Sequence, residues 1–177
     1  SGSGTLGATT NNLTLSGSAI LDLQKSVTVG NLVMATGNTI TNSSGTSSLT
    51  VGGTASLAGT ITTSGDQTYS GAVTLLANTS LISNNGTGNG TITFSSTVNS
   101  NTGTNYSLST TTGTGSTSFG GVVGGTRALS SLSTSGNASL AGSVTTTGTQ
   151  YYGANLTLTG SDISLNTTNS AVTVVGN

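Results

Sequence analysis

Short apolar–Thr–apolar triplets recur along the whole chain. Clear examples are Leu13–Leu15, Val27–Val29, Leu49–Val51, Val73–Leu75, Ile92–Phe94, Leu156–Leu158 and Val172–Val174. Alternation with a period of two is typical of a strand with one buried and one exposed face. The triplets are separated by clusters that we expect to form tight corners with positive φ, such as Gly52-Gly53, Asn84-Asn85-Gly86 and Gly120-Gly121. Helical spacing with caps is missing, so the pattern predicts an all-β protein of short strands.

One long segment of the chain occurs twice. Residues 54–75 and 137–158 are offset by 83 residues, and 12 of their 22 positions are identical. The matches Leu57/Leu140, Gln67/Gln150 and Tyr69/Tyr152 are the informative ones, because Ser, Thr and Gly coincide often in such a chain. A fixed offset of this kind indicates a repeat architecture.

Short strands and a repeat together favour a parallel β-solenoid, in which each coil buries a few apolar side chains against its neighbours. We predict a single β-solenoid over residues 1–177, with about 20 residues per coil and eight to nine coils. The 83-residue offset then corresponds to about four coils, and the rod is roughly 40 Å long. Small residues are expected in its narrow interior, namely Ala55, Ala58, Ala138 and Ala141.

The composition excludes several classes of function. The 177 residues include 39 Thr, 30 Ser, 28 Gly and 17 Asn, but no His, Cys, Pro or Trp. Without His or Cys there is no zinc site, iron–sulfur cluster, thiol nucleophile or imidazole base. Only two cations, Lys25 and Arg127, are available, so we expect no nucleic-acid partner. No stretch approaches the ~20 apolar residues of a spanning helix, and we expect no membrane span.

The acidic residues do not form a recognisable site either. Asp22, Asp66 and Asp162 are 44 and 96 residues apart, which in a regular solenoid places them two or more coils from one another. A glycosidase needs two carboxylates about 5–10 Å apart, and a calcium-binding solenoid needs an Asp in every coil. We therefore expect no enzyme activity, no catalytic or metal-binding residues and no cofactor. Asp66 is expected at a solvent-facing corner, and Lys25 is expected to pair weakly with Asp22.

Two ligand-binding alternatives stay open. Thr-x-Thr triplets at 60–62, 91–93 and 157–159 are the kind of motif that binds ice when it recurs once per coil on a flat face, which the sequence does not show. Tyrosine rings at 69, 106, 151 and 152 offer surfaces for stacking on sugars. For Tyr69 and Tyr152 we favour rings packed on the coil with the hydroxyl turned to water.

Three segments of the chain resemble a known family. Residues 62–75 (TTSGDQTYSGAVTL), 91–98 (TITFSSTV) and 118–129 (SFGGVVGGTRAL) are similar to the repeat shafts of filamentous haemagglutinin-like adhesins. These are large bacterial exoproteins of two-partner or autotransporter type. The resemblance implies a right-handed parallel β-helix that is exported, displayed on the cell surface and used in attachment.

Neither end of the sequence shows a helical or charged cap, and uncapped strand edges invite another chain. The chain is expected either to continue into neighbouring coils of a longer shaft or to stack end to end with further copies as a filament. Its net charge of −1 offers little resistance to association. The sequence thus predicts a non-catalytic structural and adhesive rod, extracellular or on a bacterial cell surface, with a host or cell-surface glycan or protein as partner. The alternative is a ligand-binding β-solenoid that recognises ice or glycan through its Thr/Asn-rich faces.

Overall fold

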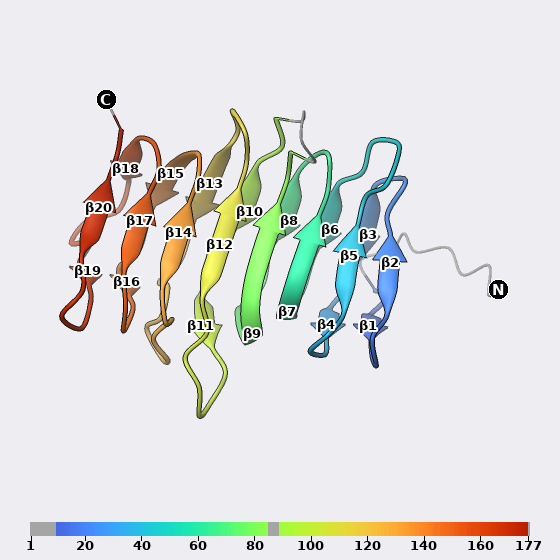
Figure 1. Cartoon of the computed structure of the whole chain (residues 1–177), viewed down its shortest axis with the longest axis horizontal. Coiled ribbons are helices and arrows are strands. Elements are labelled where there is room, and N and C mark those ends of the chain that lie inside the picture. Colours follow the sequence, from blue (N-terminus) through green and yellow to red (C-terminus); the bar gives the residue numbers. More distant parts are fainter. Residues whose placement is uncertain (1–9, 85–88, 177) are drawn as a thin grey trace.

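The computed structural model describes residues 10–84 and 89–176. Within these ranges the chain forms twenty strands and no helix, and the paired strands are parallel. They build about eight turns of about 21 residues each, stacked in chain order along the long axis (Figure 1). The predicted all-β parallel solenoid is confirmed. At ~4.8 Å per turn its length is roughly 40 Å.

Each turn has three sides, and we number the turns as coils 1 to 8. Side 1 contains β1 (Leu13–Leu15), β4 (Leu32–Met34), the first part of β7 (Ala55–Thr62) and of β9 (Val73–Ile82), β11 (Val98–Ser100), β16 (Val144–Thr145) and β19 (Leu165–Asn166). Side 2 contains β2 (Ile20–Asp22), β5 (Thr39–Thr41), the second parts of β7 and β9, β12 (Leu108–Thr111), β14 (Leu132–Thr134), β17 (Gln150–Tyr152) and β20 (Val172–Val174). Side 3 contains β3 (Val27–Val29), β6 (Leu49–Val51), β8 (Gln67–Tyr69), β10 (Ile92–Phe94), β13 (Ser116–Phe119), β15 (Asn137–Leu140) and β18 (Leu156–Leu158). In coil 6, side 1 is reduced to Val123, which bridges Val98 and Val144.

The core runs along the axis as columns of stacked side chains. Parallel pairing in register places equivalent residues of successive coils directly over one another. The triplet pattern therefore produces continuous apolar columns, and the central strands alternate buried, half-buried and buried, as in β6, β8 and β10. Among the small residues expected inside, Ala55, Ala58 and Ala138 are buried, but Ala141 is exposed. Ala58 lies within the continuous strand β7, whereas Ala141 follows the end of β15, where the chain has already left the core.

The repeated segments do not occupy equivalent sides of the solenoid. Ala55 lies on side 1 of coil 3, whereas its counterpart Ala138 lies on side 3 of coil 6. Gln67 on side 3 likewise corresponds to Gln150 on side 2. The offset is thus three full turns and two further sides, which is close to the predicted four coils but is not a whole number of them. The three sides use the same strand geometry, so one segment fits any of them.

Glycines at the corner between side 3 and side 1 are required by close packing. We predicted positive φ at the corners Gly52-Gly53 and Gly120-Gly121. That prediction is wrong, because none of these four glycines has a positive φ. A Cβ on Gly71 would lie 2.4 Å from the Gly53 carbonyl oxygen, and one on Gly121 would lie 2.6 Å from the carbonyl carbon of Ser96. Adjacent coils therefore touch backbone to backbone at this corner. The expected Asn84-Asn85-Gly86 corner lies partly outside the described residues.

Candidate functional site

Two buried Gln–Tyr pairs occupy corresponding places in the two repeat copies. The Tyr69 hydroxyl donates to Gln67 Oε1 at 2.9 Å, and the Tyr152 hydroxyl donates to Gln150 Oε1 at 3.2 Å. Each glutamine Nε2 donates to two backbone carbonyls and one threonine hydroxyl, which for Gln67 belong to Ile61, Ile82 and Thr63. Burial raises the pKa of both tyrosine hydroxyls. The rings pack on the coil as expected, but the expected exposure of the hydroxyls to water is wrong, because glutamine satisfies them inside.

An aromatic column continues from the first of these pairs along side 3. The ring of Tyr69 stacks on Phe94 with centroids 5.3 Å apart, and Phe94 stacks on Phe119 at 5.1 Å. The interplanar angles are 14° and 8°, and all three side chains are buried. This column forms the bulkiest part of the core, in coils 3 to 5, and it is not available to a ligand.

The outer surface of side 3 carries one hydroxyl per coil. The register aligns seven central strand residues in a single row, namely Thr28, Thr50, Thr68, Thr93, Ser118, Ser139 and Thr157. Ser139 Oγ donates to Ser118 Oγ at 3.1 Å. Because the strands stack at a fixed spacing, the hydroxyls form a regular ladder along the rod.

Side 2 carries two outward rows instead of one. Thr39 pairs with Thr60 in register, so the triplets 39–41 and 60–62 stack on each other, with four half-buried threonines on the outer face. In coils 4 to 6 the first row continues as Ser80, Ser109 and Ser133. The second row is interrupted by the half-buried Ile82. The first row contains an aromatic residue, Tyr151, in coil 7 and continues to Thr173 in coil 8. The Thr-x-Thr motif therefore recurs on neighbouring coils of side 2 only in coils 2 and 3.

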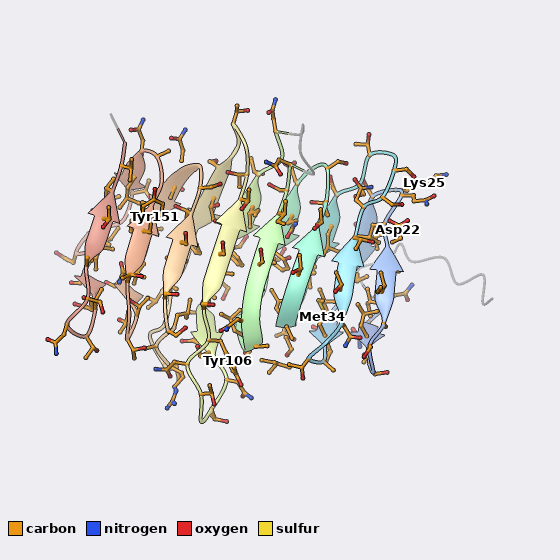
Figure 2. The ribbon with its side chains drawn as sticks, viewed as in Figure 1. Asp22, Lys25, Met34, Tyr106 and Tyr151 are labelled. Atoms are coloured by element: carbon orange, nitrogen blue, oxygen red, sulfur yellow. The ribbon has the colours of Figure 1, made fainter. Side chains whose placement is uncertain are left out.

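The other tyrosines differ in their surroundings. Tyr106 lies between β11 and β12 and packs partly against the core. Tyr151 lies on the outer face of β17, and 42% of its surface is exposed (Figure 2). Of the four rings considered as sugar-stacking surfaces, Tyr69 and Tyr152 are thus excluded by burial. Tyr151 is the one that projects from a side of the solenoid.

Asp22 is held by neutral groups of its own coil and of the next one. Its carboxylate accepts hydrogen bonds from the Ser43 hydroxyl, the Ser43 backbone N–H at 2.8 Å and Gln24 Nε2 at 3.1 Å. These bonds, above all that from the Ser43 hydroxyl, lower the pKa of Asp22. The expected pairing with Lys25 is wrong, because the hydrogen-bonding partners of the carboxylate are these groups and Thr41.

The remaining aspartates stand apart from Asp22. Asp66 is exposed at a corner, as predicted, and its Oδ1 accepts from the Thr91 N–H at 2.7 Å in the next coil. Asn31 and Asn99 make the same coil-to-coil bond, to the N–H groups of Thr54 and Thr126. Asp162 lies between β18 and β19, far along the rod. Over 10–84 and 89–176, no three His, Cys, Asp or Glu residues come together as a metal site.

Sequence reasoning missed the aromatic column and the register of the hydroxyl rows. The column had a signal, since Tyr69, Phe94 and Phe119 are each 25 residues apart and end a strand. Equal spacing of bulky residues at one strand position indicates stacking between coils. The register of the hydroxyl rows had no such signal in the sequence, because it depends on the length of every intervening corner.

Comparison with known proteins gives no relative. No protein-family model, no curated protein and no solved structure matches the chain. In the part of the chain that the structure describes, no helix is long and apolar enough to cross a membrane.

Proposed function

We propose that the protein is a non-catalytic structural rod that acts in adhesion. The observation that carries this proposal is the unbroken stacking of eight coils, with apolar columns inside and hydroxyl rows outside. Side-chain bonds from coil to coil, such as those of Asp66 and Asn99, reinforce the backbone ladders. A rod of this kind resists bending, and its uncharged polar sides offer many weak contacts to another surface.

The location and the partner follow from the same proposal. We place the rod outside the cell or on a bacterial cell surface, in line with the resemblance to filamentous haemagglutinin-like shafts. Its partner is a glycan or protein of a host or neighbouring cell. End-to-end association is the second expected contact. It is supported by the low net charge of −1, which offers little electrostatic resistance to association.

Adhesion is tested with protein-coated microspheres on layers of epithelial cells and of bacteria. We expect retention under flow to exceed that of albumin-coated spheres on at least one layer. Retention equal to that of albumin on both layers contradicts the proposal. Electron microscopy of the same material distinguishes separate rods of about 40 Å from long filaments of uniform width.

The stacked threonines of side 2 favour a second candidate, an ice-binding face. Thr39, Thr41, Thr60 and Thr62 form a regular two-by-two array of hydroxyls and methyl groups. Thermal hysteresis and inhibition of ice recrystallisation measure this activity directly. If the face binds ice, Thr60→Tyr abolishes the activity because the ring disrupts the array, whereas Thr93→Tyr on side 3 retains it.

A further inference from the structure

A hollow lies beside Tyr151 at the corner between sides 2 and 3. Its volume is about 260 Å³, and it is lined by Gly153, Ala154, Asn155, Val175 and Gly176 of coils 7 and 8. A Cβ on Gly153 would lie 3.1 Å from Tyr151 Cε1, so the ring lies beside this lining residue. Figure 2 shows Tyr151 on the outer side of β17. The hollow thus has an exposed aromatic ring on one edge.

The internal repeat shows that the fold does not need this ring. In the other copy, the positions of Tyr151, Gly153 and Asn155 are occupied by Thr68, Ser70 and Ala72. Both copies keep the buried Gln–Tyr pair and the same hydrogen bonds around it. The same scaffold therefore folds with small side chains at these places. An exposed aromatic residue and an exposed amide at the edge of a hollow call for another explanation than stability.

The chemistry around the hollow is neutral and suits hydroxyl groups. Tyr151 offers a flat apolar surface, and Asn155 offers both a donor and an acceptor in its side-chain amide. Asn155 is exposed, and its backbone N–H donates to Asn137 Oδ1 at 3.2 Å while its carbonyl accepts from the Ala138 N–H at 2.9 Å. Its side-chain amide makes no hydrogen bond to the described residues. Ser133 and Thr173 flank Tyr151 in the outward row of side 2. None of these groups is charged, which matches an uncharged ligand.

We propose that Tyr151 and Asn155 form a binding site for one neutral hexopyranose residue of a glycan. The Tyr151 ring stacks on the C–H face of the sugar, and the Asn155 amide bonds its hydroxyl groups. A glycine is required at 153 by the preceding coil, because a Cβ there would lie 2.9 Å from the Thr134 carbonyl oxygen and 3.0 Å from that of Ser135. This inference rests on the proposed adhesive function and gives that function the chemistry of its partner.

Saturation-transfer NMR on the whole chain tests the site with glucose, galactose and N-acetylglucosamine as separate probes. We expect binding of at least one sugar in the millimolar range. Tyr151→Thr and Asn155→Ala introduce the residues found at these positions in the other repeat copy. Each is expected to weaken binding at least tenfold. Circular dichroism verifies that both variants keep the β fold. Tyr106→Phe, which leaves the hollow unchanged, is the matched control and is expected to bind like the wild type.

Two results overturn the site: no binding of any of the three sugars at about 10 mM, and unchanged binding by the folded Tyr151→Thr variant. The microsphere assay separates this failure from that of adhesion. If spheres coated with the Tyr151→Thr variant stay attached, the protein is adhesive, and the result contradicts the site as the cause of adhesion. Sugar binding by wild-type protein whose spheres do not attach supports the site and contradicts adhesion.

Discussion

Gln67 and Gln150 are the central residues of the buried polar network that both repeat copies contain. Each places a side-chain amide in the apolar interior and satisfies it with a tyrosine hydroxyl, a threonine hydroxyl and two carbonyls. A buried polar group left without its partner costs about 1–3 kcal/mol. Replacing the whole network with apolar groups should therefore lower the free energy of unfolding less than removing one of its members.

A double-mutant cycle measures this coupling. Gln67→Leu leaves the Tyr69 hydroxyl and the Ile61 and Ile82 carbonyls without this partner, and we expect a loss of about 2 kcal/mol in the free energy of unfolding. Adding Tyr69→Phe removes the orphaned hydroxyl, so the double variant should lose less than the sum of the single changes. Urea denaturation gives all four values. Strict additivity would contradict the coupling.

The two buried tyrosines also predict how stability depends on alkaline pH. Their pKa is raised by burial above the ordinary value of 10.0, so the folded state keeps the proton that the unfolded state loses. Their contribution to stability is complete below pH 10 and declines as the pH rises above it. In the variant Tyr106→Phe/Tyr151→Phe, only the buried pair remains. We expect tyrosinate absorbance to appear together with loss of the β-sheet circular dichroism signal, and tyrosinate in a protein with a native spectrum would contradict this.

Among the elements, β8, β10 and β13 depend on one another through the aromatic column. Phe94 lies in the middle of this column, with a ring on each side. We expect Phe94→Ala to lower the free energy of unfolding by about 3–5 kcal/mol, since it opens a cavity in a closely packed core. Thr93→Ala, one position along the same strand but facing outward, should cost less than about 1 kcal/mol. Equal losses in the two variants would contradict the stacking.

The sequence predicted the positions of the short strands well, but it predicted the long strands and the reason for the corner glycines poorly. Triplets such as Ile92–Phe94 predicted strands correctly, because a buried–exposed–buried pattern depends only on the residues themselves. The long strands β7 and β9 were not predicted, because they continue around a corner that other coils form with a loop. Gly53 and Gly121 were recognised as corner residues, but the reason was missed. It lies in the neighbouring coil, where the Asn31 side chain approaches Gly53, and the Ser96 backbone approaches Gly121, too closely for a Cβ.

At the scale of the whole molecule, each coil contacts only its two neighbours, so stability is a sum of coils and interfaces. We expect Phe94→Ala to accelerate hydrogen exchange in coils 3 to 5 and to leave coils 1 and 8 unchanged. Exchange followed by mass spectrometry resolves these segments. Uniform acceleration along the chain would contradict this prediction and indicate a single cooperative unit.

The candidate site belongs to this scale as well, and the sequence predicted only part of it. Tyr151 was identified as one of four rings suited to sugars, whereas Tyr152 beside it was expected to pack on the coil. The two point in opposite directions from one strand, and the buried Gln150 shows which of them faces the core. The hollow at Gly153 was not predictable, because it depends on how the corners of coils 7 and 8 are stacked.

The offset of three turns and two sides between the repeat copies has a consequence for how such a rod meets its surroundings. Each successive copy of the segment faces a direction rotated by one third of a circle about the axis. In an array of several copies, any residue of the segment is presented on all three flanks in turn, and every third copy returns to the first. A rod built in this way presents the same residues in every direction around its axis. It can contact a partner surface in any rotational orientation, and several equivalent weak contacts along one side would then act together to increase the total affinity.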